Sequence, residues 1–309
     1  MNPILEPQAF LTRRQFLRRR ALGLVAAPLF HRHLFAAEKP PVAGLRVFIM
    51  GHSFHMFIAQ PLGALAAAAG IQGHELVGRQ SIGGSRVIQH WNLPDEKNLA
   101  KAALREAKVD VLTMSPNWIV PDEGIERFVE LGLQHNPKLR VVVQLSWMPG
   151  DAFDAKDKVK SNEERDTRPL DIPLAAHARW KGLLEPQLRA LNQKLGRDVI
   201  HVAPAGDALL KLRALILAGK VPGITKQSEL FTDAGGHGKM PVIALVTYCN
   251  FVCIYRISPV GLNDPQPELD KLTPDLKPLL QRVAWEAATA HPMSGVTATA
   301  TGRESKTVK

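Results

Sequence analysis

Residues 47–55, VFIMGHSFH, combine an apolar run with three polar side chains. The run ends at Gly51, and Ser53 then stands between His52 and His55. Four apolar residues that stop at a glycine are typical of a buried strand followed by a tight turn. We therefore expect Ser53 in the loop after a strand. There it is either the N-cap of the next helix, the simpler explanation for a lone serine, or a nucleophile.

Outward from this stretch, short apolar runs alternate with longer amphipathic ones. This alternation predicts βαβ units, and hence a three-layer α/β/α sandwich around a mostly parallel sheet. We expect strands at residues 45–50, 74–77, 109–114, 139–145 and 199–203. We expect helices at residues 61–69, 94–107, 123–135, 175–195, 207–218, 241–255 and 274–290.

The two ends of the chain read differently from residues 38–293, which we assign to one domain. The run Thr12-Arg13-Arg14-Gln15-Phe16-Leu17 resembles the twin-arginine consensus, and residues 21–30 form an apolar stretch behind it. Residues 1–37 are therefore predicted to be a signal segment that directs export, to the periplasm or beyond, through the twin-arginine machinery; a basic disordered arm is the alternative. Ten apolar residues are too few to span a bilayer, which needs about twenty. Residues 294–309, small, polar and basic, are expected to be a disordered tail.

The charge of the chain gives no support for nucleic-acid binding. The formal net charge is +10, but six of the 39 basic residues and one of the 29 acidic residues lie within residues 1–37. The remaining chain carries a net charge of +5 and has no basic stripe flanked by aromatic residues.

Residues 150–173 interrupt the periodic pattern. Twelve of these twenty-four residues are charged, and neither strand nor helix periodicity is visible. Such a segment is typical of a surface insertion, mobile or lid-like.

The chain has two cysteines, Cys249 and Cys253. They lie four residues apart in an apolar stretch, so in a helix they share one face. We expect two buried thiols rather than a disulfide or a metal pair.

The position of Ser53 argues against the α/β-hydrolase type of serine enzyme. In that fold the nucleophile lies in a G-x-S-x-G turn, and a loop that supplies an oxyanion donor precedes it. His55 occupies the place of the second glycine here, and only about fifteen residues of the 38–293 domain precede Ser53. No room is left for the preceding loop.

Four polar stretches follow or approach the expected strand ends in chain order: Gly51-His52-Ser53, Ser81-Ile82-Gly83-Gly84-Ser85, Ser115-Pro116-Asn117 and Asp233-Ala234-Gly235-Gly236-His237. Each has an ordinary explanation as a cap or a turn, but the ordered set resembles the SGNH (GDSL-like) hydrolase family over about residues 45–262. The resemblance implies an SGNH/flavodoxin-like sandwich. It implies Ser53 as nucleophile, His237 as base and Asp233 as the residue that orients the base. It also implies an oxyanion hole made by the N–H groups of Ser53 and of Gly83 or Gly84 and by the Asn117 amide.

The sequence departs from the family pattern at three points. His52 replaces an aspartate before the serine, which puts a bracing hydrogen bond in doubt, and Ser115 replaces a glycine. Three residues instead of two separate Asp233 from His237. We expect Gly235 and Gly236 to absorb the additional residue as a bulge.

The residue types alone suit acyl transfer. A serine hydroxyl needs a base within hydrogen-bond reach, and an imidazole oriented by a carboxylate supplies one. We therefore predict an exported serine hydrolase of the carboxylesterase or acetylesterase type that forms an acyl-enzyme on Ser53. Trp91, Trp118 and Trp147, in or just after the expected site loops, favour carbohydrate esters as substrates, although packing is the simpler role for any one of them.

Two other functions remain open from the sequence. A catalytically silent relative that binds a glycan would retain the fold with the altered motifs. A metal-binding periplasmic protein would use His52 and His55, with His90 or His237, although no carboxylate at ligand spacing accompanies them. The prediction itself includes neither metal nor cofactor.

Overall fold

The computed structural model of the protein describes residues 42–265, 267–271 and 273–297. The predicted signal segment, residues 1–37, lies outside these residues. Of the predicted tail, only residues 294–297 are described, and among them Ser294 and Val296 are buried.

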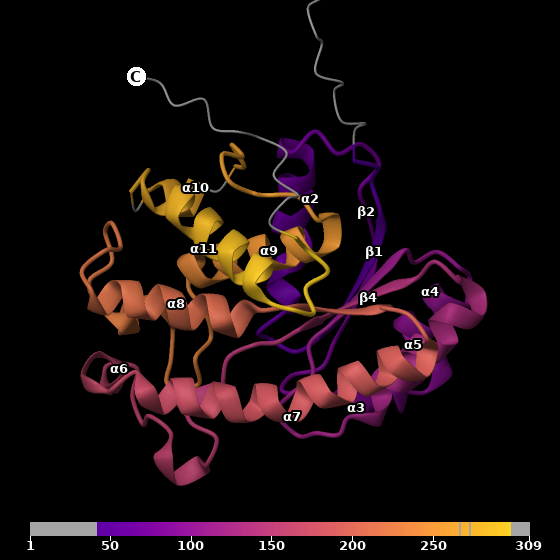
Figure 1. Ribbon diagram of the computed structural model, residues 1–309, viewed down its shortest axis with the longest axis horizontal. Helices are drawn as coiled ribbons and strands as arrows, with labels where there is room; N and C mark the ends of the chain where they lie inside the picture. The colour runs from indigo at the N-terminus through magenta and orange to yellow at the C-terminus, as the bar shows by residue number, and fades with distance from the viewer. Residues whose placement is uncertain (1–41, 266, 272, 298–309) are drawn as a thin grey trace, which may run out of the picture. The chain divides into compact units, whose positions relative to one another are not determined.

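A five-stranded parallel sheet forms the middle of the domain, with strand order β2-β1-β3-β4-β5 (Figure 1). Its strands are β1 Arg46–Gly51, β2 Glu75–Ser81, β3 Val111–Met114, β4 Arg140–Gln144 and β5 Ile200–Ala203. This order reverses between β1 and β3, and ligands bind at such a reversal outside the carboxyl ends of the strands. The loop that carries Ser53 leaves β1 at this point.

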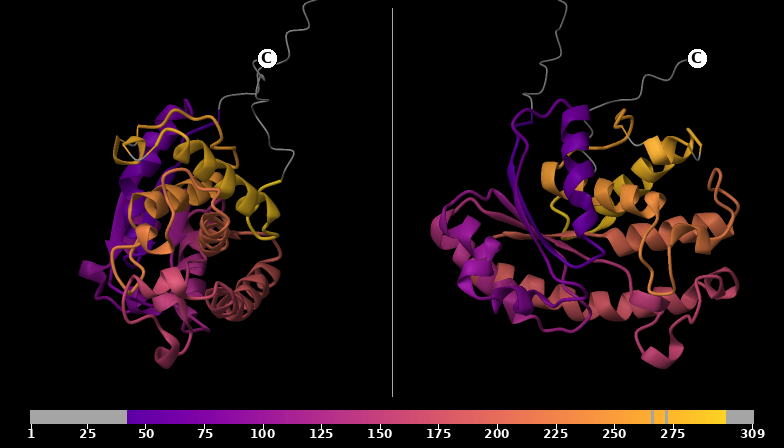
Figure 2. Two further views of the ribbon diagram at one scale, coloured as in Figure 1. Left: turned by 90° about the vertical axis from the view of Figure 1, so that its left-hand side faces the viewer. Right: turned by 180° about the vertical axis from the view of Figure 1, so that it is seen from behind.

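Helices cover both faces of the sheet, so the predicted three-layer α/β/α sandwich is confirmed (Figure 2). One layer holds α2 Ala59–Ala68, α8 Ala205–Leu217, α9 Met240–Tyr255 and α11 Leu276–Ala290, with the short α10 Pro267–Asp270 against α9 and α11. The other layer holds α3 Val87–Trp91, α4 Leu99–Arg105, α5 Glu123–His135 and α7 Asp171–Leu195. The described residues also form a short helix, α6 Glu164–Thr167, and five 3-10 turns: η1 Met56–Ile58, η2 Asp95–Lys97, η3 Pro149–Asp151, η4 Ala155–Asp157 and η5 Gln227–Leu230.

The alternation of side chains along β1 divides the core into two clusters. Val47 and Ile49 pack toward α2 and α9, whereas Phe48 and Met50 pack toward α4 and α5. Because both faces are covered, the strand is apolar throughout instead of alternating with polar residues. This explains why the stretch before Ser53 reads as a continuous apolar run.

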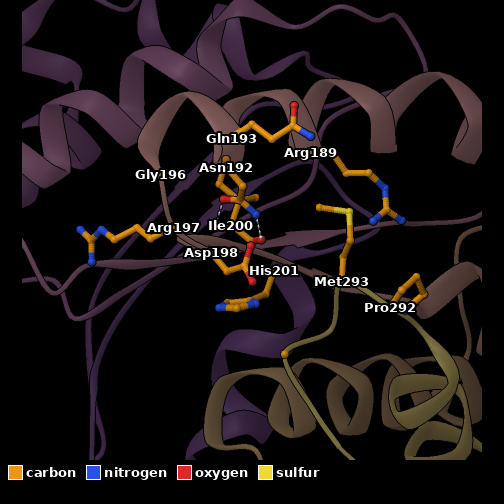
Figure 3. A pocket seen from close by; sticks show the side chains of 11 residues that line it. Arg189, Asn192, Gln193, Gly196, Arg197, Asp198, Ile200, His201, Pro292 and Met293 are labelled. Carbon is orange, nitrogen blue, oxygen red and sulfur yellow. Dashed lines mark hydrogen bonds between the residues drawn. The ribbon is translucent and has the colours of Figure 1, made fainter.

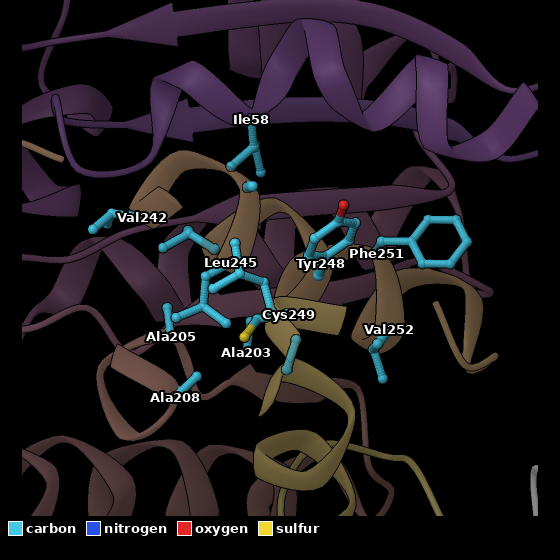
Figure 4. Close-up of a cluster of buried hydrophobic side chains, with 14 of the residues drawn as sticks. Ile58, Ala203, Ala205, Ala208, Val242, Leu245, Tyr248, Cys249, Phe251 and Val252 are labelled. Carbon is cyan, nitrogen blue, oxygen red and sulfur yellow. The ribbon is translucent and has the colours of Figure 1, made fainter. Parts of the chain in front are cut away.

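Helix α9 is the most deeply buried helix, and its apolar residues point in all directions (Figure 4). Cys249 and Cys253 lie in it, both with no exposed surface and both as free thiols. Burial raises the pKa of Cys249 well above its usual value and that of Cys253 to about 12. Two inert buried thiols are therefore what the structure contains, as expected.

Three predicted elements have clearly different bounds in the structure, and one of them, α7, begins at Asp171, four residues earlier than predicted. The second strand reaches Ser81 instead of ending at residue 77, because its backbone stays paired with β1 up to Gly51. The helix predicted at residues 94–107 is a 3-10 turn followed by α4. Asn98 separates the two: its side chain accepts a hydrogen bond from the N–H of Lys101 at 3.0 Å and so caps α4.

Residues 150–173 form short helical turns and the start of α7. Most of their charged side chains face solvent, but Asp151 and Arg165 are buried. Such burial was not predicted from the charged sequence.

Among the described residues, no helix is long and apolar enough to cross a membrane.

Candidate active site

Ser53 lies in the loop that directly follows β1. Gly51 ends the strand with a φ of +155°, and a Cβ atom there would come within 3.1 Å of the Ser115 Cβ. The close approach of the β1 and β3 ends thus requires glycine at this position. Ser53 caps no helix, because α2 begins six residues later after η1. Its side chain is free for another partner.

That partner is His237. The Ser53 hydroxyl donates to His237 Nε2 at 2.9 Å, and His237 Nδ1–H donates to Asp233 Oδ2 at 2.7 Å. The carboxylate fixes the tautomer that leaves Nε2 as the acceptor. The structure therefore brings together the three residues predicted as nucleophile, base and orienting acid, although 184 positions separate Ser53 from His237.

The loop from Asp233 to His237 closes on the Asp233 side chain. Asp233 Oδ1 accepts the N–H groups of Gly236 at 2.8 Å and of His237 at 3.2 Å. Partial burial raises the pKa of Asp233, but the hydrogen bonds from the His237 ring and from these N–H groups outweigh it and hold the pKa below its usual value. Gly236 has a φ of +95°, a conformation that glycine adopts without strain. The backbone thus turns at Gly236, next to His237, whose ring reaches the Asp233 carboxylate.

The predicted oxyanion loops lie next to one another. The N–H of Ile82 donates to Gly51 O at 3.1 Å, which joins the Gly83-Gly84 turn to the end of β1. Asn117 Nδ2 donates to Gly84 O at 3.0 Å, which joins the third loop to the second. Within the described part of the chain, no hydrogen bond uses the N–H groups of Ser53, Gly83 or Gly84. These three donors remain available to a negatively charged oxygen.

The two residues that depart from the family pattern, His52 and Ser115, bind each other. His52 Nδ1 accepts the N–H of Phe54 at 3.3 Å, so Nε2–H is left to donate to Ser115 Oγ at 3.2 Å and to Pro116 O at 3.4 Å. Burial lowers the pKa of His52 to about 4, so the ring is neutral near pH 7. The brace that an aspartate would supply is thus replaced by an imidazole–hydroxyl pair.

His55, two residues after Ser53, lies in a buried polar network. Its Nδ1–H donates to Gln144 Oε1 at 2.7 Å, and its Nε2 accepts from the Thr113 hydroxyl at 2.8 Å. Gln144 Nε2 in turn donates to Phe54 O and to Ser146 Oγ, each at 2.7 Å. Burial lowers the pKa of His55 to about 4. This histidine supports the loop and does not face a substrate.

His90 has a similar supporting role under the second loop. Its ring nitrogens bind Ser85 Oγ at 2.8 Å and Gln80 Nε2 at 3.2 Å. Each of the four histidines considered as metal ligands therefore has its own separate hydrogen-bond partners. Among the described residues, no group of three or more metal-ligating side chains occurs.

The three tryptophans have different surroundings. Trp147 is buried, stacks on Phe54 with ring centroids 4.5 Å apart, and donates from Nε1 to Gly236 O at 2.9 Å. It packs against the loop from Asp233 to His237, called the histidine loop below, and the hydrogen bond to Gly236 O restrains that loop. Trp91 packs on Phe128. Trp118, next to Asn117, is partly exposed, and Lys158 Nζ lies 5.0 Å from its ring centroid.

Asp122 is a supporting residue that the site prediction did not include. Its buried carboxylate accepts the N–H groups of Val87, Ile88 and Gly124 at 2.6–3.1 Å, so it joins the start of α3 to the start of α5. Burial raises the pKa of Asp122, although the three N–H donors oppose this. Its place before the predicted helix at residues 123–135 is a recognisable N-cap signal, but the bond to α3 has no signal in the sequence.

A separate cavity of about 480 Å³ lies at the amino end of β5, beneath the end of α7 (Figure 3). Arg189, Asn192, His201 and Met293 are among the residues that line it. Because the strands are parallel, this is the sheet edge opposite to Ser53. The Asn192 side chain is already bonded to the backbone of residues 199 and 200.

Comparisons with known proteins concern the fold. No model of a protein family matches the sequence, and no curated protein matches it. A solved structure of a DUF4886 family protein from Bacteroides uniformis is similar over 82% of this chain and 97% of its own, with 14% identity and a TM-score of 0.53.

Two further solved structures match with lower scores. A candidate SGNH hydrolase from Slackia heliotrinireducens shares 17% identity over 67% of this chain and 97% of its own, with a TM-score of 0.41. A candidate GDSL-like lipase from Parabacteroides merdae shares 12% identity over 69% of this chain and 97% of its own, with a TM-score of 0.38. At these identities the likeness is one of fold alone.

Proposed function

We propose that the protein is an exported serine esterase that forms an acyl-enzyme on Ser53. The observation that carries the proposal is the continuous chain of hydrogen bonds from Ser53 through His237 to Asp233, with distances of 2.9 and 2.7 Å. Nucleophile, base and orienting acid in this order are the arrangement that activates a serine hydroxyl. Its position at the carboxyl edge of the sheet, where the strand order reverses, adds support.

The chain's own groups account for each step of ester hydrolysis. His237 takes the proton as Ser53 Oγ attacks the carbonyl carbon, and then returns it to the leaving alcohol. Asp233 balances the positive charge on the imidazole in the meantime. The N–H groups of Ser53 and of Gly83 or Gly84 and the amide of Asn117 are the donors for the oxyanion. Loss of one such donor raises the barrier by about 3 kcal/mol. Water then attacks the acyl-enzyme: His237 takes a proton from the water and returns it to Ser53 Oγ as the acid product leaves.

Esters of carbohydrates are the substrate class that we favour. The partly exposed Trp118 next to Asn117 is an aromatic surface of the kind on which sugar rings stack. Export, which we propose from the twin-arginine motif, supports this choice, because carbohydrate polymers occur outside the cytoplasm.

Hydrolysis of p-nitrophenyl acetate and longer acyl homologues tests the proposal. We expect a clear rate for the full chain and its loss in Ser53→Ala and in His237→Ala, whereas His135→Ala, at an exposed position of α5, retains it. A rate that does not depend on Ser53 contradicts the mechanism. Binding of a glycan without hydrolysis of any ester would instead favour the catalytically silent alternative.

Fractionation of cells tests export separately. We expect the intact chain outside the cytoplasm and its Arg13→Lys/Arg14→Lys variant inside, because the twin-arginine pathway reads both guanidinium groups. The double variant of Arg18 and Arg19 to lysine is the matched control. Equal export of both variants contradicts the signal assignment.

A further inference from the structure

Arg165 is a fully buried arginine in the charged segment, with 0% of its side chain exposed. Its guanidinium points at the histidine loop of the site. Nη1–H donates to Asp233 O at 2.8 Å, and Nη2–H donates to Ala234 O at 2.6 Å. A planar guanidinium that grips two consecutive carbonyls restrains both the position and the orientation of the peptide between them. That peptide follows the residue that orients His237.

On the side away from the loop, Arg165 forms an ion pair with a buried carboxylate, Asp151, that also binds a second buried arginine, Arg213. Arg213 donates to both oxygens of Asp151 at 2.9 and 2.8 Å, and Arg165 Nε lies 3.4 Å from Asp151 Oδ2. Asp151 and Arg213 are each only 2% exposed. Two buried cations thus share one buried anion, which leaves a positive charge directed at the Asp233 end of the loop.

Neighbours of Arg165 also bind the charged segment, residues 150–173, to the stretch at residues 227–231. Asn162 Nδ2 donates to Ser228 O at 2.8 Å and to Phe231 O at 3.1 Å, and Asp166 accepts the N–H and the hydroxyl of Ser228. Gln227 Nε2 donates to Arg165 O at 2.6 Å. The charged segment is therefore docked along residues 227–234, immediately before His237.

We propose that Arg165 is a positioning residue of the hydrolase site: it clamps the Asp233–Ala234 peptide so that Asp233 stays in line with His237. The inference rests on the proposed function for its catalytic part. The need for a clamp follows from the loop itself, because Gly235 and Gly236 allow many backbone conformations. A reacting group that moves by about 1 Å loses a rate factor of about 100.

Substitution of Arg165 tests this in kinetics. In Arg165→Ala we expect kcat to fall about 100-fold with little change in KM, because the substrate does not touch Arg165. Millimolar guanidinium should restore a large part of kcat, whereas urea, which has a similar shape without the charge, should not. The control is Arg168→Ala, which removes a partly exposed arginine of the same segment that donates to Asp157 O. It should retain the parent rate.

Arg165→Lys is a second, milder substitution that tests the proposal if Arg165→Ala does not fold. A lysine keeps the buried charge but cannot grip both carbonyls, so we expect a fall of about tenfold in kcat in a protein that still unfolds cooperatively, at a lower temperature than the parent. A kcat equal to that of the parent in a folded Arg165→Lys or Arg165→Ala protein overturns the proposal.

Hydrogen exchange separates the clamp from the enzymatic function. The amides of Thr232, Gly236 and Lys239 are hydrogen-bonded within the loop. In Arg165→Lys they should exchange faster than in the parent, while amides of β4 do not change. If the parent hydrolysed no ester but these amides were loosened, the enzymatic proposal would fail and the clamp would stand. Unchanged exchange of these amides in Arg165→Lys would contradict the proposed role of Arg165, even if the parent is an active enzyme.

Discussion

His237 and His55 are two hydrogen-bonded histidines near Ser53 that have opposite surroundings. The His237 side chain is 48% exposed and lies between a hydroxyl and the Asp233 carboxylate. His55 is 0% exposed and lies between a hydroxyl and the amide of Gln144. Both rings donate from Nδ1 and accept at Nε2.

The two sites differ in how they receive a proton on Nε2. At His237 the carboxylate balances the new positive charge, and solvent is near. At His55 a neutral amide oxygen faces the charge in a site closed to solvent, and burial lowers the pKa to about 4. With similar hydrogen-bond distances, His237 therefore suits a general base, whereas His55 suits a purely structural role.

Exchange of each imidazole for an amide should separate the two roles most strongly. We expect His237→Gln to lower kcat by a factor on the order of 10⁴ or more, because no base remains for Ser53. His55→Gln retains a donor and an acceptor and should lower kcat by less than about tenfold. Ester hydrolysis by both variants, with folding checked by circular dichroism, is the measurement. Equal losses would contradict the comparison.

Removal of the carboxylate charge should have the next largest effect. Asp233→Asn retains an oxygen for the loop N–H groups, but it no longer balances a protonated His237 or fixes its tautomer. A fall in kcat on the order of 10³-fold is expected. Asp154→Asn, at an exposed site of the charged segment, is the matched control. A normal rate in Asp233→Asn would show that the acid has no part in catalysis.

The buried imidazole should instead appear in the pH dependence of stability. The folded pKa of His55 is about 4 and the unfolded value is about 6.5, so the unfolded chain binds more protons between these values. The free energy of unfolding therefore falls as the pH drops from 6.5 toward 4, and His55 accounts for about 2 kcal/mol of the loss at pH 5.

Urea unfolding at pH 7.5 and pH 5 measures this contribution. His55→Gln should lose about 2 kcal/mol less than the parent on acidification, since glutamine does not titrate. His135→Gln, at an exposed site, should lose as much as the parent. The same acid loss in His55→Gln would mean that the ring is not held neutral.

Trp147→Phe should have the smallest effect. Phenylalanine retains the stack on Phe54 but cannot donate to Gly236 O. Loss of one hydrogen bond, about 1 kcal/mol, should loosen the histidine loop and reduce kcat by about fivefold. Trp91→Phe, on the other side of the sheet, is the control. A parent-like kcat would assign Trp147 to packing alone.

The fold class and most element positions could be predicted because they depend on local periodicity. The pattern of a few neighbouring residues is enough to indicate the strand before Ser53 and each amphipathic helix. The motifs that contain Ser53, Asn117 and His237 then predicted a shared site through their resemblance, in this order, to the SGNH family. Parallel strands end at one edge of the sheet, so residues that follow different strands meet there.

The supports of the site could not be predicted. The bond between His52 and Ser115 joins residues 63 positions apart, and read separately each of them only weakened the family pattern. Arg165 lies in a run of charges that reads as a solvated surface, yet its guanidinium is buried against Asp233 O. Neither contact has a periodic or local signature.

The sequence therefore specified the sandwich and the buried thiols of Cys249 and Cys253, because local patterns encode burial and strand ends. The candidate nucleophile, base and acid followed from the resemblance of the ordered motifs to the SGNH family. Which histidine near Ser53 can accept its proton, and how its loop is held, depended on the folded chain. Solvent access and the charge of a hydrogen-bond partner are properties of residues brought together from distant positions, and they decide whether an imidazole can carry a proton.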